Sequence, residues 1–83
     1  MNYRVELKPR AVKDLRCIPQ HDSSSIANAL ERLQFNLAGD VKKLTNFTPE
    51  YRLRVGSFRV LFEVEDEARI VVYRVLHRRE AYR

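Results

Sequence analysis

The sequence predicts an α+β fold in which two N-terminal helices pack on one face of a four-stranded, mainly antiparallel sheet. Residues 51–64 alternate between apolar and polar side chains, residues 26–37 carry apolar side chains at helical spacing, and residues 70–75 are rich in β-branched side chains. The expected element order is strand, helix, helix, strand, strand, strand. A chain of 83 residues has room for one core, so we expect a single domain over residues 1–83.

The start of the chain predicts the first strand and the first helix. Residues 2–8 alternate between apolar and polar side chains, which is typical of a strand. Pro9 is favoured in the first turn of a helix, because an N–H at that position would have no partner within the helix. Apolar side chains between residues 11 and 18 continue this helix, and Pro19 ends it.

An apolar stripe at helical spacing predicts the second helix. The stripe consists of Ile26, Leu30, Leu33 and Leu37. Asp22 or Ser23 is suited to cap the start of this helix, and Gly39 is suited to stop it. Residues 40–49 are then expected to form a connecting loop whose two lysines face water.

A Gly-Ser pair joins two strands predicted over residues 51–55 and 58–64. A two-residue loop that starts with glycine suits a tight hairpin turn, and it places Arg54 opposite Arg59. Side chains alternate across a strand, so Arg52, Arg54 and Arg59 share one face and the apolar side chains share the other. Like charges that face each other destabilise a hairpin. A polyanion such as RNA, bound against this face, would remove the repulsion.

The last strand is predicted over residues 69–76, and its nearly continuous apolar side chains indicate a central place in the sheet. If the turn before this strand is a two-residue loop at residues 66–67, Arg74 faces Arg59 and the row of arginines crosses three strands. If the loop is longer, Arg74 is a solvated surface residue. The helices are expected to leave the arginine face of the sheet open.

The charge of the chain favours an anionic partner, such as nucleic acid or an acidic protein. The net charge is +5, and residues 51–83 contain arginine but no lysine, which suits planar recognition of phosphate. The single cysteine, Cys17, allows no intrachain disulfide and is expected to be a small core residue. We find no signal peptide and no apolar stretch of membrane-spanning length, so we expect a cytoplasmic protein with no membrane partner.

Two segments of the chain resemble the RelE/ParE toxin superfamily, and most of all its RelE branch. Residues 51–64 read Tyr-Arg-Leu-Arg-Val-Gly-Ser-Phe-Arg-Val-Leu-Phe-Glu-Val, and residues 70–82 read Ile-Val-Val-Tyr-Arg-Val-Leu-His-Arg-Arg-Glu-Ala-Tyr. Length and element order agree too, so the resemblance covers nearly the whole chain. It implies a RelE-like fold with the active site on the open face of the sheet.

The resemblance also implies an activity and a set of partners. It implies the toxin of a type II toxin–antitoxin system, an endoribonuclease that cuts mRNA in the ribosomal A site. In this reaction a 2′-OH attacks the neighbouring phosphate, and no metal or cofactor takes part. The implied partners are a cognate antitoxin, the ribosome with its mRNA, and operator DNA for the toxin–antitoxin complex. The alternative is the ParE branch, whose members inhibit DNA gyrase and have no nuclease activity.

The resemblance assigns catalytic roles to Arg52, Arg54, Arg59, Arg78 and Tyr82, with Arg79 as the alternative to Arg78. Arg59 is the first choice, and Arg78 the second, for stabilising the charge that builds on the phosphate in the transition state. Arg52 and Arg54 are expected to position the RNA. Arg74 and Arg79 complete the predicted RNA-binding set.

Proton transfer is harder to assign from the sequence. The family enzymes include one with lysine where this chain has Arg52 and Arg54, and an arginine stays charged and is a poor general base. Histidine is the side chain type suited to exchange protons near neutral pH, so His77 is a candidate acid or base, although it can equally well just end the last strand. Tyr82 is expected to stack on a base, to act as an acid, or to pack over the edge of the core.

Overall fold

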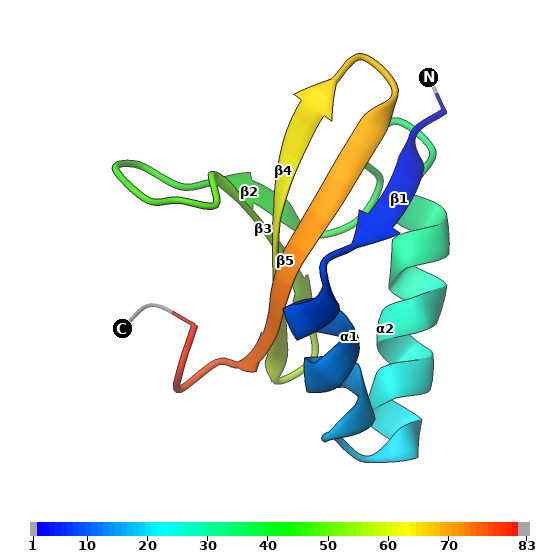
Figure 1. Ribbon diagram of the computed structural model, residues 1–83, viewed down its shortest axis with the longest axis vertical. Helices are drawn as coiled ribbons and strands as arrows, with labels where there is room; N and C mark the ends of the chain where they lie inside the picture. Colours follow the sequence, from blue (N-terminus) through cyan, green and yellow to red (C-terminus); the bar gives the residue numbers. More distant parts are fainter. Residues whose placement is uncertain (1, 82–83) are drawn as a thin grey trace.

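Five strands form one mixed sheet in the computed structural model, which describes residues 2–81 (Figure 1). The elements are β1 (Arg4–Leu7), α1 (Pro9–Arg16), α2 (Gln20–Leu33), β2 (Val41–Lys43), β3 (Tyr51–Val55), β4 (Phe58–Asp66) and β5 (Arg69–His77). The strand order is β1-β5-β4-β3-β2. Strand β1 pairs with β5 in parallel, and all other pairs are antiparallel. The predicted α+β class and the interior position of the last strand are confirmed, and the element order differs from the prediction by one additional strand after the helices.

The prediction of four strands was wrong, because residues 40–49 do not form only a loop. Strand β2 lies within them and pairs with β3, with Val41 opposite Leu53 and Lys43 opposite Tyr51. Two of its three residues are exposed lysines, so it has no apolar alternation to mark it. Short edge strands that carry lysine are a common protection against edge-to-edge pairing.

The second helix also differs from the prediction at both ends. Pro19, with extended backbone, is its N-cap, and the helix begins at Gln20 rather than after Asp22 or Ser23. It ends at Leu33, six residues before Gly39. Asn36 and Leu37 follow with φ angles of 58° and 56°, which is left-handed backbone that a right-handed helix does not contain.

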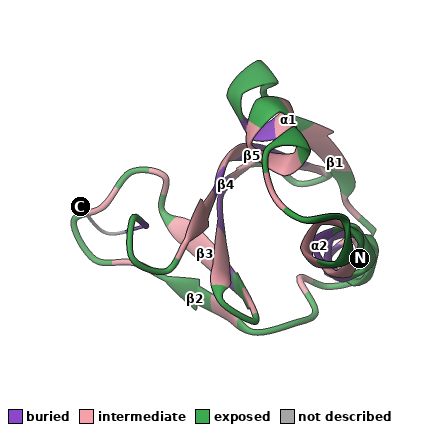
Figure 2. Cartoon of the chain, turned by 90° about the horizontal axis from the view of Figure 1, so that it is seen from below, coloured by how far each residue is buried: buried purple, intermediate pink, exposed green. Residues whose placement is uncertain are grey.

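The core lies between the sheet and the two helices, which cover one face of the sheet (Figures 1 and 2). Its largest fully buried side chains are Phe62, Ile26, Leu33, Leu53, Ile70, Val60 and Val72. The hairpin contributes the apolar face that its alternation predicts, since Leu53, Val60 and Phe62 all belong to this core. The C-terminal segment after β5 and the segment between β2 and β3 extend on the other side of the sheet (Figure 1).

The pairing of β4 with β5 corrects the predicted register. Arg59 lies opposite Leu76, and Arg74 lies opposite Leu61, so Arg59 and Arg74 do not face each other. The ladder contains irregularities between Leu61 and Phe62 and again between residues 64 and 66. The two shifts cancel before Arg59, since the pairs Asp66–Arg69 and Arg59–Leu76 lie in the same register. The prediction is wrong because the two-residue turn lies at residues 67–68 and not at residues 66–67.

Asp14 of α1 covers the part of β5 that β1 leaves without a parallel partner. Strand β1 pairs only with residues 69–72 of β5. Beyond them, the Asp14 carboxylate accepts a hydrogen bond from the Val75 N–H at 2.9 Å and from Arg74 Nε at 2.8 Å and Nη2 at 3.2 Å. Burial alone would raise the pKa of Asp14, but these hydrogen bonds and the charge of Arg74 outweigh it and lower the pKa. Arg74 therefore joins α1 to the sheet.

Candidate nucleic-acid interface

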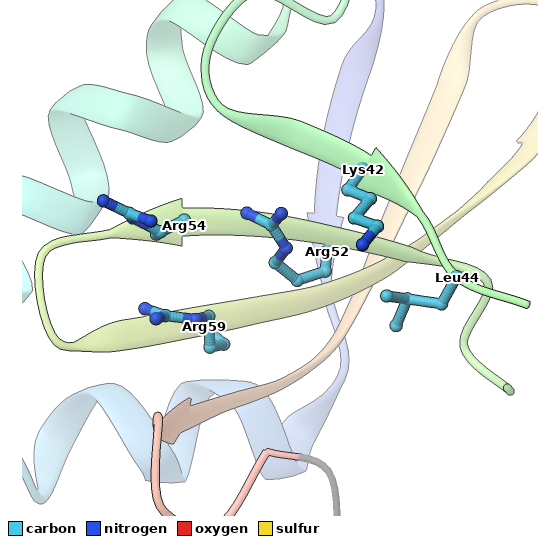
Figure 3. Close-up of a pocket in the computed structure, with 5 residues that line it drawn as sticks. All are labelled: Lys42, Leu44, Arg52, Arg54 and Arg59. Carbon is cyan, nitrogen blue, oxygen red and sulfur yellow. The ribbon is translucent and has the colours of Figure 1, made fainter.

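Three arginines of the β3–β4 hairpin lie on the face of the sheet that points away from the core. The predicted register is confirmed, with Arg54 opposite Arg59 and Arg52 opposite Leu61. In Figure 3 the side chains of Arg52, Arg54 and Arg59 lie on the same face of the hairpin. Together with Lys42 and Leu44 they line a surface depression of about 380 Å³, which we call the arginine depression. The structure confirms that the three arginines share one face, and their roles in binding and catalysis stay predictions.

Carboxylate and carbonyl oxygens contact the guanidinium groups of the three arginines and reduce the repulsion between them. The Asp40 carboxylate lies between two of them, with Oδ1 3.4 Å from Arg52 Nη1 and Oδ2 3.4 Å from Arg54 Nε. Arg52 Nη1 also donates to the Asp40 carbonyl at 3.2 Å. Arg59 Nη1 donates to the carbonyl oxygens of Gly56 and Phe58, each at 3.0 Å. These contacts order the guanidinium groups before any ligand arrives.

Burial differs strongly between the arginines of the depression. The Arg52 side chain is 13% exposed, whereas that of Arg54 is 59% exposed. The Arg52 side chain is thus largely buried, whereas the Arg54 side chain is mostly exposed to solvent. An arginine offers several N–H donors in one plane and matches two oxygens of a phosphate at once. A depression with four cationic side chains on a sheet surface is suited to bind the backbone of a nucleic acid.

Sequence reasoning missed Asp40, Lys42 and Leu44 as parts of this site. All three lie in the segment predicted to be a loop, and they reach the arginines because β2 pairs with β3. The Arg54 N–H donates to the Asp40 carbonyl at 3.0 Å, which fixes Asp40 at the start of this pairing. Alternation in the hairpin predicts its own two faces but not which neighbouring segment lies beside them.

The C-terminal candidates are placed near the hairpin turn but outside the lining of the arginine depression, as far as residues 2–81 show. The Arg78 N–H donates to the Ser57 carbonyl at 2.8 Å, so the segment after β5 starts beside the turn. The side chains of Arg78 and Arg79 are exposed. Tyr82 lies outside the described residues.

His77 is not brought together with the three arginines. It pairs with Phe58, whose side chain packs against the core, and the two rings meet edge to face with centroids 5.6 Å apart. The side chain therefore lies on the helix side of the sheet, where it lines a second depression with Cys17 and Asp14. Its Nδ1 accepts a hydrogen bond from the Arg79 N–H at 3.2 Å. This geometry fits the alternative in which His77 ends the last strand.

Arg74 is the predicted RNA-binding residue that the structure separates most clearly from the others. Its guanidinium group binds Asp14, and this contact raises the pKa of Arg74. Cys17, expected in the core, is exposed. Residues 2–81 contain no group of three or more His, Cys, Asp or Glu side chains that could hold a metal ion, and no helix there is long and apolar enough to cross a membrane.

Comparison with known proteins identifies the class of protein that this fold and this site define. Residues 5–82 match the family described as ParE toxin of type II toxin-antitoxin system, parDE. The match covers nearly the whole chain, so the chain belongs to this family. It is a toxin of the RelE/ParE superfamily of type II toxin–antitoxin systems.

Individual relatives carry the name of the RelE branch. The chain is 37% identical to Toxin RelE3 of Methanocaldococcus jannaschii over 76 residues, which cover 86% of this chain and 85% of that protein. The toxin in the RelB-RelE antitoxin-toxin complex from Methanococcus jannaschii is 35% identical, with a TM-score of 0.75 over 92% of this chain and 93% of the other. The archaeal RelE-RelB complex from Pyrococcus horikoshii OT3 gives 26% identity and a TM-score of 0.76 over 98% and 100% of the chains. The predicted RelE-like fold is confirmed.

Proposed function

We propose that this toxin is an endoribonuclease that cuts mRNA in the ribosomal A site, and that the arginine depression is its active site. The observation that carries the proposal is the pairing of Arg54 with Arg59 beside Arg52 on an exposed face of the sheet. A toxin that only needed a stable sheet would gain nothing from like charges placed opposite each other. The names of the relatives, which belong to RelE toxins, support the same activity.

The chemistry proposed for the site is the attack of a ribose 2′-OH on the neighbouring phosphate. Negative charge then grows on the phosphate oxygens, and donors that are already oriented stabilise it. Arg59 serves this role because its Nη1 donates to the carbonyl oxygens of Gly56 and Phe58, each at 3.0 Å, and these hydrogen bonds orient the guanidinium group. Arg52 and Arg54 bind the scissile phosphate and its neighbour. The proposal uses no metal or cofactor, and assigns the stabilisation of charge to arginine side chains.

Residues near the C-terminus complete the proposed site. Arg78 starts beside Ser57 and reaches the same phosphate from the other side of the turn, with Arg79 as the alternative. Tyr82 stacks on a base of the RNA. The proposal leaves the proton-transfer groups open and gives no role in catalysis to Arg74 or His77.

The proposed setting is the cytoplasm, where the toxin meets the ribosome and a cognate antitoxin. The solved relatives are complexes of a RelE toxin with a RelB antitoxin, which supports an antitoxin partner for this chain. A net charge of +5 favours an antitoxin that wraps the domain with an amphipathic helix and acidic contacts. Co-expression with the small protein encoded next to the toxin gene tests this: co-purification is expected, and its failure would contradict the partner. A toxin–antitoxin complex on operator DNA is part of the same proposal.

The activity is tested by primer extension on ribosome-bound mRNA after induction of the toxin. We expect breaks with codon periodicity for the wild type and a loss of about a hundredfold or more in cleavage rate for Arg59→Ala. Arg32→Ala is the matched control, because it removes the same charge from the exposed end of α2. An Arg59→Ala variant that folds and cleaves like the wild type would remove the assignment.

The second candidate function is inhibition of DNA gyrase, and the family description, which names ParE, favours it. The same induction experiment separates the two activities. Intact mRNA, continued translation, and filamentous cells with damaged DNA would support gyrase inhibition. Rapid arrest of translation with cleaved mRNA supports the nuclease.

A further inference from the structure

The Asp40 carboxylate lies between Arg52 and Arg54, two of the arginines that line the depression, although an acid there weakens attraction for RNA. Each of its oxygens faces a different guanidinium group, Oδ1 that of Arg52 and Oδ2 that of Arg54, both at 3.4 Å. A phosphate that bridges two arginines uses two of its oxygens in the same way. We propose that Asp40 is a phosphate mimic, which occupies the binding position of one RNA phosphate and is displaced when RNA binds.

The contacts of this carboxylate fit a group that leaves readily. Charge-assisted hydrogen bonds between nitrogen and oxygen are normally about 2.7–2.9 Å long, so two contacts of 3.4 Å are loose. The Asp40 side chain is 55% exposed, and water can solvate it after it swings away. The main chain of Asp40 stays in place meanwhile, because its carbonyl accepts from the Arg54 N–H at 3.0 Å and from Arg52 Nη1 at 3.2 Å.

The backbone before Asp40 is built to deliver this residue to the arginines. Gly39 has a φ angle of 126°, which residues with a side chain rarely adopt. A Cβ at Gly39 would also lie 2.9 Å from Leu53 Cδ1, closer than real contacts allow. The chain therefore passes directly over Leu53 and reaches Asp40 beside β3. The carboxylate is placed by this crossing and not by a flexible loop.

The inference rests on the proposed function, since it assumes that RNA binds the arginine depression. It adds that Asp40 lowers the affinity of the depression for RNA, because RNA must break the ion pairs of Asp40 with Arg52 and Arg54 before it forms its own. Exposed ion pairs are weak, so the expected reduction in affinity is about threefold to tenfold. An acid that only positioned Arg52 and Arg54 would instead strengthen RNA binding. The two roles predict opposite signs.

The test measures binding of a fluorescent single-stranded RNA with 2′-O-methyl sugars, which cannot be cleaved, by fluorescence anisotropy at low and physiological salt. Asp40→Asn keeps the shape and the main-chain contacts but removes the charge, and we expect it to bind RNA about threefold to tenfold more tightly than the wild type. Asp40→Glu keeps a carboxylate and is expected to stay close to the wild type. Weaker or unchanged binding by Asp40→Asn, with an unaltered melting temperature, would overturn the inference.

Glu67→Gln is the matched control for net charge. Glu67 is an exposed carboxylate in the β4–β5 turn, at the other end of β4 from Arg59. Nine strand residues separate the two ends by about 25 Å at roughly 3.3 Å per residue, well beyond the screening length of about 8 Å at physiological salt. Glu67→Gln should therefore leave RNA binding unchanged there. If it tightens binding as much as Asp40→Asn, the effect is one of net charge and the inference is wrong.

Arg52→Ala in the same assay separates this inference from the proposed function. Weaker binding by Arg52→Ala together with no gain for Asp40→Asn would refute only the role of Asp40. If the wild type does not bind the RNA even at low salt, or Arg52→Ala binds as well as the wild type, RNA does not use this depression. Both the proposed function and the role of Asp40 then fall.

Discussion

Replacing Asp14 by alanine should destabilise the fold far more than an ordinary change on a helix surface. The carboxylate accepts three hydrogen bonds, two from the Arg74 guanidinium group and one from the Val75 N–H. All three join α1 to β5 across 60 or more residues of sequence. Asp14→Ala removes all three hydrogen bonds. The Val75 N–H then has no acceptor from Asp14, in a residue that is only 2% exposed.

The size of the effect follows from what is left without a partner. A buried N–H that loses its acceptor costs about 1–3 kcal/mol. The Arg74 side chain is 32% exposed and can turn to water, so the loss of its ion pair adds only about 1 kcal/mol. The free energy of unfolding should therefore fall by about 2–4 kcal/mol. In a domain of this size that lowers the melting temperature by roughly 10–25 °C.

Thermal unfolding followed by circular dichroism measures the melting temperature. Urea unfolding at 25 °C measures the free energy of unfolding. Asp14→Asn should lose about half as much, because its amide oxygen still accepts from Val75. Glu31→Ala is the control, since Glu31 is an exposed carboxylate on α2 and its loss should change stability by at most about 0.5 kcal/mol. A melting temperature of Asp14→Ala within about 3 °C of the wild type would correspond to a loss of less than about 1 kcal/mol. Asp14 would then not stabilise the packing of α1 against β5.

Three further predictions follow from the same structure. Because the pKa of Asp14 is lowered in the folded state, its stabilisation is present above the unfolded-state pKa of about 4 and is lost as the pH falls through the lower folded value; the difference in unfolding free energy between wild type and Asp14→Asn should thus shrink below about pH 4 in urea titrations. Gly39→Ala should cost about 2–3 kcal/mol, and Gly56→Ala, also at positive φ but with nothing within 4 Å of its Cβ, only about 1 kcal/mol, as measured by urea unfolding. Arg59→Lys keeps the charge but not the planar donors, so mRNA cleavage in the primer-extension assay should fall about tenfold or more, and full activity would show that charge alone suffices.

The first hairpin could be predicted residue by residue because two independent signals agree there. The Gly-Ser turn fixes the register, and the alternation of apolar side chains assigns the faces, so the positions of Arg52, Arg54 and Arg59 followed from local sequence. The second hairpin lacks that agreement. Its turn lies at residues 67–68, and the charged run Glu65-Asp66-Glu67 contains no Gly or Pro that would fix this position. A turn assumed at residues 66–67 therefore placed Arg74 opposite Arg59.

Other errors have physical causes of the same kind. Leu37 continues the helical spacing of α2, yet the chain has already turned into left-handed backbone at Asn36, so periodicity overestimated the helix. Strand β2 carries too few apolar residues to be visible, and Asp40 could not be assigned to the site without it. The roles of Arg59, Arg78 and Tyr82 in catalysis stay predictions, and the Arg59 variants above test the first of them.

Strand β4 runs from the arginine end of the molecule to an acidic end, where Glu65 and Asp66 are its last two residues and Glu67 begins the following turn. These opposite charges contribute an electric dipole along this strand, which Arg69 reduces by pairing with Asp66. In the field of a long polyanion such a molecule rotates during its approach, so that the hairpin turn leads and the acidic turn trails. Orientation before contact raises the rate of productive encounters, and added salt should slow this association more than it speeds release.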